Sequence, residues 1–271
     1  MRIVDKDRTK TSAGGARAKS PNLTIMKVED LLEKPVRNAK GVLMVGNFAM
    51  KVGREPVRLY ATPSKQIPSF EMEGDEDSAS ITKNFEAFHP GDTLEIQEFI
   101  QEFTDQEVIM IYGACDTPDK KVFGEPCAAM KMRASLVDDQ DMLGYNLTFT
   151  QMNKDTTLPG LYRGPLPTAN FFQATSEDLA LTQANGVLVK LASSELGESV
   201  DVVEIDLENN QFVTIAGGGG TSPQVIADGA GTEATFVLKD GTSFIGLENA
   251  RITFEVFVGG STTFLIERNR S

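Results

Sequence analysis

The chain of 271 residues is 40% hydrophobic, 7% aromatic and 24% charged, a composition typical of a globular chain with room for one large domain or two small ones. Its 26 basic and 39 acidic side chains give a formal net charge of −13. This charge argues against a globally basic nucleic-acid binder, because phosphates repel an acidic surface. One histidine and two cysteines leave little for metal or nucleophilic chemistry, so we expect no enzyme, no cofactor and no bound metal.

The first forty residues are basic, although the whole chain is acidic. They hold ten basic and five acidic side chains, a net of +5, so the other 231 residues carry −18. Residues 1–20 show no apolar periodicity and no apolar segment of a signal peptide, so we expect a flexible arm and no secretory signal. No apolar run reaches the roughly 18–20 residues of a membrane span. Two interpretations of residues 1–40 stay open: a solvated tail, or a basic arm that binds an acidic neighbouring copy.

Residues 41–152 have the pattern of a β domain that carries one helix. The runs GVLMVGNFAMKV and VRLYA predict two strands in a hairpin, and an acidic loop is expected between residues 63 and 80. A helix is expected from Asp92, with Glu95 completing a capping box. Its apolar stripe consists of Ile96, Phe99, Ile100 and Phe103. Further strands are predicted at 108–114, 120–124, 128–138 and 145–151, with an acidic hairpin tip at 138–141.

Residues 153–170 are predicted to form a linker, because they contain three prolines and two glycines. Residues 171–271 then show short apolar runs divided by Gly, Asn and Asp, the spacing of a β-sandwich or barrel. Hairpin turns are expected at Asn209-Asn210, Asp240-Gly241 and Gly259-Gly260. The glycine run at 217–220 lacks the lysine of a phosphate-binding loop and is interpreted as a flexible turn.

No constellation of residues predicts catalysis. His89, beside Pro90 and Gly91, is interpreted as a structural turn histidine. Cys115 and Cys127 are expected to be reduced, although a disulfide between them stays open. The carboxylates between residues 71 and 77 do not have the spacing of an EF-hand, so a solvated or interface loop is favoured over a cation site.

One longer stretch resembles a known family. The run FEMEGDEDSASITKNFEAFHPGDTLEIQEFIQEFTDQEVIMIYGACD, continued by KKVFGEPCAAMKMRASLVDDQDMLGYNLTFTQ, is similar to the tail-tube (major tail) proteins of tailed bacteriophages, especially phages of Bacteroidetes. The shared features are an acidic loop, a strand, the HPGD helix entry, an amphipathic helix, a strand, a Cys-containing hairpin and a closing LTFTQ-like strand. The resemblance covers roughly residues 70–152.

The resemblance implies a mainly β subunit: a tail-tube-type barrel or sandwich flanked by the helix over 92–103. The spacing of the strands after residue 170 predicts a C-terminal β-sandwich-like domain, and in related proteins an added β domain can decorate the tube. Such subunits form hexameric rings that stack into a tube in the virion tail, assembled in the host cytoplasm. Other tail proteins contact the tube ends, genomic DNA passes as non-specific cargo, and no membrane is involved. The family's bridging arms and loops, with the charge asymmetry of this chain, indicate candidate contacts between subunits and rings: Arg2, Lys6, Arg8, Lys10, Arg17, Lys19, Glu71, Glu73, Asp75, Glu76 and Asp77.

A tail-tube subunit is therefore the expected function, and carboxylates on the bore would keep DNA sliding. Another virion component of the same fold, such as a baseplate hub, tail terminator or connector, stays open. So does a host-glycan-binding module in the C-terminal domain, although the chain has no Trp and four Tyr to stack on sugars. A hydrolase built on the 71–77 carboxylates is not favoured, because no positioned acid/base pair is visible.

Overall fold

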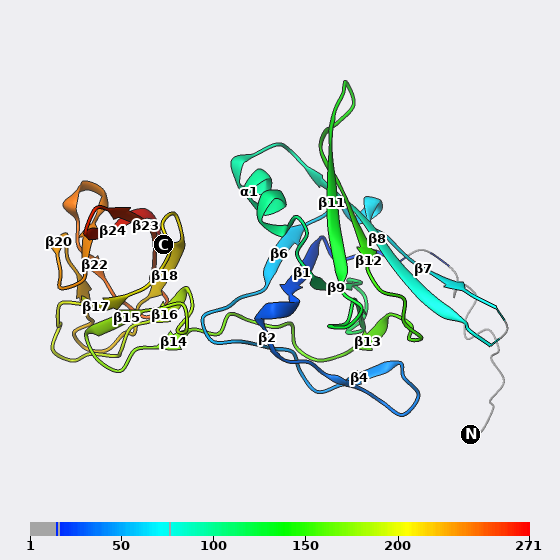
Figure 1. Cartoon of the computed structure of the whole chain (residues 1–271), viewed down its shortest axis with the longest axis horizontal. Coiled ribbons are helices and arrows are strands. Elements are labelled where there is room, and N and C mark those ends of the chain that lie inside the picture. Colours follow the sequence, from blue (N-terminus) through cyan, green and yellow to red (C-terminus); the bar gives the residue numbers. More distant parts are fainter. Residues whose placement is uncertain (1–14, 16, 76) are drawn as a thin grey trace. The chain divides into compact units, whose positions relative to one another are not determined.

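Short apolar runs broken by glycine, proline and acidic residues fold into strands, and the described chain is mainly β with one α-helix (Figure 1). The computed structural model describes residues 15, 17–75 and 77–271. They form two compact units. The first unit comprises the described residues up to Glu29, together with Lys34–Asn47 and Val57–Leu166; the second comprises Asp30–Glu33, Phe48–Pro56 and Pro167–Ser271. This division differs from the predicted boundaries at residues 40, 152 and 170. Two short segments before residue 57 belong to the second unit, and the first unit continues to Leu166.

The first unit is built on an 11-stranded sheet among the described residues. Its elements are β1 (Asn22–Lys27), β3 (Val36–Arg37), β4 (Leu43–Val45), β6 (Val57–Tyr60), β7 (Ile67–Glu73), β8 (Ser80–Pro90), α1 (Leu94–Phe103), β9 (Val108–Gly113), β10 (Lys120–Phe123), β11 (Met130–Asp138), β12 (Leu143–Gln151) and β13 (Gly160–Tyr162), with the short turns η1 (Val28–Asp30) and η2 (Pro63–Lys65).

The strands of this sheet follow the order β3-β4-β13-β10-β9-β11-β12-β8-β7, and β1 pairs with both β6 and β9. All these pairs are antiparallel except β4 with β13. The core lies on the face that carries Phe85, Met110 and Phe149, which are fully buried. Beyond the named strands, the Thr62 N–H donates to the Phe88 carbonyl over 2.9 Å, so the chain after β6 reaches β8.

Helix α1 packs on this core through the predicted stripe. Ile96 and Phe103 are buried, and Phe99 and Ile100 pack half-buried beside them. The predicted capping box is wrong. Thr93 occupies the N-cap without a side-chain cap hydrogen bond, and Asp92 Oδ1 instead accepts hydrogen bonds from the side chains of Gln97 and Tyr145.

Two long hairpins extend from the first unit: β7–β8 and β11–β12 (Figure 1). The predicted loop between residues 63 and 80 is therefore wrong at Ile67–Glu73, because this segment pairs in continuous register with β8. The expected hairpin between residues 41–52 and 57–61 is also wrong, since β4 pairs with β3 and β13 while β6 pairs with β1. By contrast, the acidic tip between β11 and β12 is confirmed, as is the alternation that buries Leu147, Phe149 and Gln151.

The second unit combines parallel and antiparallel strand pairs. Its elements are β2 (Leu31–Glu33), β5 (Ala49–Met50), β14 (Phe172–Gln173), β15 (Asp178–Leu181), β16 (Leu188–Lys190), β17 (Asp201–Ile205), β18 (Phe212–Ala216), β19 (Val225–Ile226), β20 (Gly229–Ala230), β21 (Ala234–Val237), η3 (Lys239–Gly241), β22 (Phe244–Ile245), β23 (Arg251–Gly259) and β24 (Thr262–Arg270).

Successive strands of this unit alternate between two stacks. β14, β16 and β18 pair in parallel in one sheet, and β15 and β17 pair in parallel in another, which gives a solenoid-like region. The antiparallel hairpin β23–β24 extends the first of these sheets from β18. Of the three predicted hairpin turns, only Gly259-Gly260 joins two strands that pair with each other. Asn209-Asn210 connects β17 to β18 and Asp240-Gly241 lies between β21 and β22, and in both cases the two strands pair with other strands.

The glycine run at 217–220 is a tightly packed backbone crossing, so its interpretation as a flexible turn is wrong. A Cβ added at Gly217, Gly218 or Gly220 would overlap carbonyl oxygens of neighbouring segments. The Gly219 N–H donates to the Gly246 carbonyl over 3.0 Å, and the Gly219 carbonyl accepts from Ser194 N–H over 3.2 Å. These glycines are needed because three backbones meet with no room for side chains.

Candidate interaction surfaces

The outer edge of β7 is a free strand edge at one end of the sheet of the first unit. β7 ends the sheet order and pairs only with β8 among the described residues. Three of its apolar side chains are exposed: Ile67 at 53%, Phe70 at 45% and Met72 at 66%. Phe70 and Met72 stand opposite Lys83 and Ile81 of β8, which are buried, so these two side chains extend the core face of the sheet into solvent. An edge strand with unpaired backbone groups and exposed apolar side chains is a template for strand pairing with another chain.

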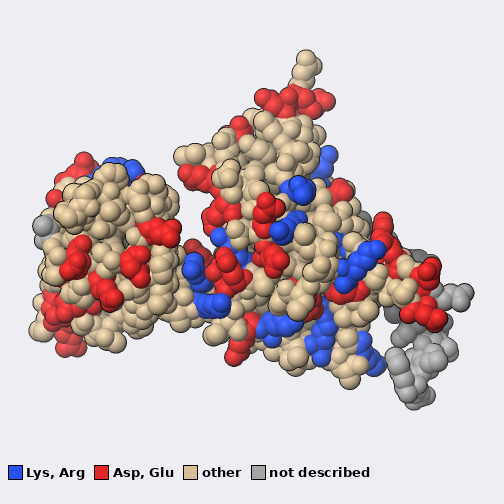
Figure 2. All heavy atoms as spheres, viewed as in Figure 1, with Lys and Arg blue, Asp and Glu red and all other residues tan. Residues whose placement is uncertain are grey.

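The tip of the β11–β12 hairpin is a compact group of carboxylates. Asp138, Asp139 and Asp141 are all exposed, and Figure 2 shows acidic side chains gathered at the end of this hairpin. Asp139 Oδ1 accepts hydrogen bonds of 2.8 Å from the backbone N–H groups of Asp141 and Met142, which fixes the turn. The other two carboxylates have no protein partner among the described residues, so the tip presents two free anionic groups on an ordered turn.

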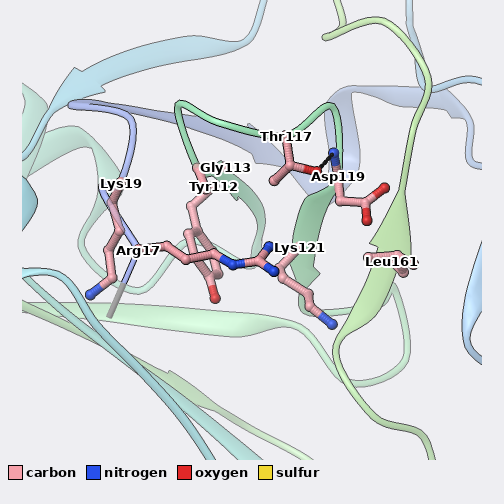
Figure 3. Close-up of a pocket in the computed structure, with 9 residues that line it drawn as sticks. Arg17, Lys19, Tyr112, Gly113, Thr117, Asp119, Lys121 and Leu161 are labelled. Atoms are coloured by element: carbon pink, nitrogen blue, oxygen red, sulfur yellow. Dashed lines mark hydrogen bonds between the residues drawn. The ribbon is translucent and has the colours of Figure 1, made fainter. Parts of the chain in front are cut away.

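A basic hollow lies at the end of β9, where the β9–β10 turn meets the segment before β1. It has a volume of about 350 Å³ and is lined by Arg17, Lys19, Tyr112, Gly113, Ala114, Thr117, Asp119, Lys121 and Leu161. Arg17 and Lys19 reach it because the backbone at residues 18–20 pairs with Gly113–Cys115. Figure 3 shows the Arg17 side chain passing Tyr112 toward Lys121, whose ammonium points away from the guanidinium, while Lys19 is directed to the other side.

The acidic residue of this hollow, Asp119, interacts electrostatically with Arg17 and Lys121, but its hydrogen bond goes to a third cation, Arg163. Asp119 Oδ1 accepts a 2.6 Å hydrogen bond from Arg163, which lowers the pKa of Asp119 below its ordinary value. Lys19 Nζ donates to the Gln66 carbonyl. Arg17 and Lys121 have no ion-pair partner in the described part of the chain, and burial raises the pKa of the neighbouring Tyr112 phenol, so that side chain stays neutral at pH 7. The hollow therefore keeps an excess of positive charge, with Arg17 and Lys121 outside any direct ion pair among the described residues.

A network of charges holds the first unit together beside these surfaces. Lys83 Nζ donates to Asp155 Oδ2 at 2.6 Å. Glu125 accepts from Arg37 at 2.7 Å and from Lys34 at 2.9 Å. Burial alone would raise the pKa of Glu125, but these two hydrogen bonds outweigh it and the pKa is lowered. All these groups have protein partners, so the network is structural.

The predicted contact residues are only partly within the described chain. Arg2, Lys6, Arg8, Lys10 and Glu76 lie outside the described residues. Arg17 and Lys19 line the basic hollow rather than a free arm. Glu71 and Glu73 lie on β7 and are exposed, and Asp75 and Asp77 lie in the turn that follows. Glu73 forms an ion pair with Lys154.

The histidine and the two cysteines that the sequence offered for chemistry are not gathered into a site. His89 Nδ1 lies 2.9 Å from the Tyr60 carbonyl, and Cys115 and Cys127 are exposed free thiols. No group of three or more His, Cys, Asp or Glu side chains in the described ranges is arranged to hold a metal ion. Among the helices that the structure describes, none has the length and apolar character of a membrane span.

The second unit carries an aromatic patch on the outer face of β18, β23 and β24. Phe212 and Phe257 are 50% and 47% exposed, and Phe257 contacts Phe264, with their ring centroids 6.3 Å apart. The strand alternation that buries Val213, Phe254 and Leu265 places these rings on the opposite face. Residues 167–271 also carry five basic and fourteen acidic side chains, a net of −9, so much of the acidic excess belongs to this unit.

Sequence reasoning missed the role of Lys121 and Tyr112, because only the pairing of β10 with β9 brings them beside Arg17. The one local signal was the adjacent pair Lys120-Lys121 after a Pro-Asp turn.

Comparison with known proteins finds no relative of this chain: no protein family, no curated protein and no solved structure matches it.

Proposed function

We propose that this chain is a structural subunit of a phage tail tube. Its copies would assemble as stacked hexameric rings around a bore for the genome, with the first unit as the barrel- or sandwich-type tube domain and helix α1 on its outside. The proposal rests on the resemblance of residues 70–152 and on the surfaces of the first unit. It treats the protein as non-enzymatic and places it in the virion tail.

The free edge of β7 is the observation that carries this proposal. A monomeric protein gains nothing from a free strand edge with exposed Ile67, Phe70 and Met72, because such an edge invites pairing with other chains. In a closed assembly the edge of each copy is covered by its neighbour, and the exposed apolar side chains become buried. Self-assembly therefore explains a feature that would otherwise favour aggregation.

Charge supports the same role. The exposed carboxylates on β7 and at the β11–β12 tip repel phosphates wherever they approach DNA. A duct for DNA needs few lysine or arginine contacts to phosphate, since each one must break during passage. The acidic composition of the chain is compatible with that demand.

Electron microscopy of the purified full-length chain tests the proposal. We expect uniform hollow tubes, or rings that stack as protein concentration rises. Single rings that never stack would favour a tail terminator, hub or connector. A chain that remains monomeric at high concentration, by sedimentation velocity, would overturn the assembly role.

A glycan-binding role for the second unit is the alternative that one observation favours. The exposed rings of Phe212 and Phe257, with Phe264 beside them, form an aromatic face on which a sugar could stack. Binding of the full chain to a glycan array, lost on Phe257→Ser, would support this alternative. An array without any bound glycan would reject it.

A further inference from the structure

The basic hollow and the acidic tip lie at opposite ends of the same pair of strands. β9 and β11 are antiparallel and meet at Val108 and Met130. From that point β9 continues to the hollow at Gly113, and β11 continues in the opposite direction to the tip at Asp138. At about 3.3 Å per residue, the two sites are roughly 40 Å apart. The tip of one copy therefore cannot reach the hollow of the same copy.

The two sites are also chemically complementary. The hollow presents the Arg17 guanidinium and the Lys121 ammonium beside a neutral Tyr112 phenol, and its one carboxylate, Asp119, is hydrogen-bonded to Arg163 (Figure 3). The tip presents the Asp138 and Asp141 carboxylates on a turn that Asp139 holds in place. Carboxylates bind guanidinium and ammonium groups through short charge-assisted hydrogen bonds, and Tyr112 could donate a further one.

We propose that the basic hollow is a docking site for the acidic hairpin tip of a second copy of this chain. The Asp138 and Asp141 carboxylates of one copy would pair with Arg17 and Lys121 of the next. This inference rests on the proposed self-assembly and specifies one of its contacts. Lys19, held by the Gln66 carbonyl, adds positive potential without binding directly.

The contact is directional, which sets the kind of assembly that it builds. Different surfaces of the two copies meet, so each copy keeps a free tip at one end and a free hollow at the other. Such a head-to-tail contact joins copies into a closed ring or an open filament, and does not form a two-fold dimer. In the proposed tube we assign it to the stacking of copies, and the β7 edge to contacts within a layer.

Charge reversal at each end tests the contact. The hollow variant combines Arg17→Glu with Lys121→Glu, and the tip variant combines Asp138→Lys with Asp141→Lys; Asp139 is kept because it holds the turn. Each variant alone brings like charges together, so we expect the concentration needed for assembly to rise at least about tenfold. Light scattering and negative-stain images measure this concentration, and circular dichroism checks the fold.

Two combinations should restore assembly. A chain with all four reversals has an acidic hollow and a basic tip, which again attract. An equimolar mixture of the hollow variant and the tip variant should also co-assemble, because each supplies the partner that the other needs. A control chain with Lys65→Glu and Glu98→Lys reverses exposed charges elsewhere in the first unit and should assemble like the wild type.

The outcomes separate this contact from the proposed function. Wild-type tubes that neither end variant weakens would overturn the contact and leave the tail-tube proposal standing. Weakening by the hollow variant alone would show that the hollow binds another anionic group, and would equally overturn the inference. A wild-type chain that never assembles overturns both proposals. Rescue by the fourfold variant and by the mixture would establish the contact.

Discussion

Lys83 Nζ donates a 2.6 Å hydrogen bond to Asp155 Oδ2, and the lysine side chain is only 1% exposed. The backbone of Asp155 also exchanges two hydrogen bonds, of 2.6 and 3.2 Å, with the backbone of Ile81, two residues before Lys83 on β8. Burial lowers the pKa of Lys83, against the opposing effect of its hydrogen bond to Asp155. The ion pair thus ties the segment after β12 to the first half of β8, opposite Phe70 of β7.

Replacing Asp155 by Asn should destabilise the first unit strongly. The Lys83 ammonium would remain buried without its anion, and breaking a buried pair from one side costs about 3–5 kcal/mol. Lys154→Gln is the matched control, because its pair with Glu73 is exposed and worth less than about 1 kcal/mol. Differential scanning calorimetry compares the two variants. Equal, small losses of Tm would show that the Lys83 charge is not held by Asp155.

Gly218→Ala should destabilise the second unit. The added Cβ would overlap the carbonyl oxygens of Leu191 and Ala192, and neither backbone segment is free to move within the parallel stack. We expect a loss of about 3 kcal/mol or more, from overpacking. Gly113→Ala is the control, since its Cβ would meet nothing closer than Lys120 Cγ at 3.6 Å. Urea unfolding followed by circular dichroism measures both; a Gly218→Ala chain as stable as the control would refute the tight crossing.

The features that sequence could predict are those encoded locally. The stripe from Ile96 to Phe103 marks α1, because a helix buries residues at a spacing that its own sequence displays. The alternation of Leu147 and Phe149 marks β12 in the same way. The acidic tip is local as well, since three aspartates between two apolar runs favour a turn over a strand.

Pairing between distant segments was not predicted, because no local pattern in the sequence encodes it. β7 is rich in Glu and Pro and looks like a loop until β8 supplies its hydrogen-bond partner. Short apolar strands separated by Gly and Asn look alike whether they form antiparallel hairpins or parallel stacks, so the stacking of β14, β16 and β18 was not visible. The basic hollow combines Arg17 with Lys121 across three strands, and no sequence spacing encodes that approach.

Glu125 should make stability depend on pH in the acid range. Its pKa in the folded chain lies below the ordinary value of 4.5, so the folded state binds this proton less readily than the unfolded state. The stabilisation is therefore complete above about pH 4.5 and is lost as the pH falls through the lowered folded pKa. Urea midpoints of the wild type and of Glu125→Gln should differ at pH 6 and converge toward pH 3. A gap that stays constant over this range would contradict the contribution of this carboxylate.

Lysines on β7 should prevent assembly and leave the fold intact. Ile67→Lys and Met72→Lys place a charge on each face of the edge strand, and a charged edge resists pairing with another strand. Both side chains are more than half exposed, so neither substitution buries a charge and Tm should stay close to that of the wild type. Leu94→Lys is the control, because Leu94 is 69% exposed on α1, away from any strand edge. Sedimentation velocity should find the two β7 variants as single copies and the α1 variant assembled; β7 variants that assemble as well as the wild type would show that this edge is not the contact between copies.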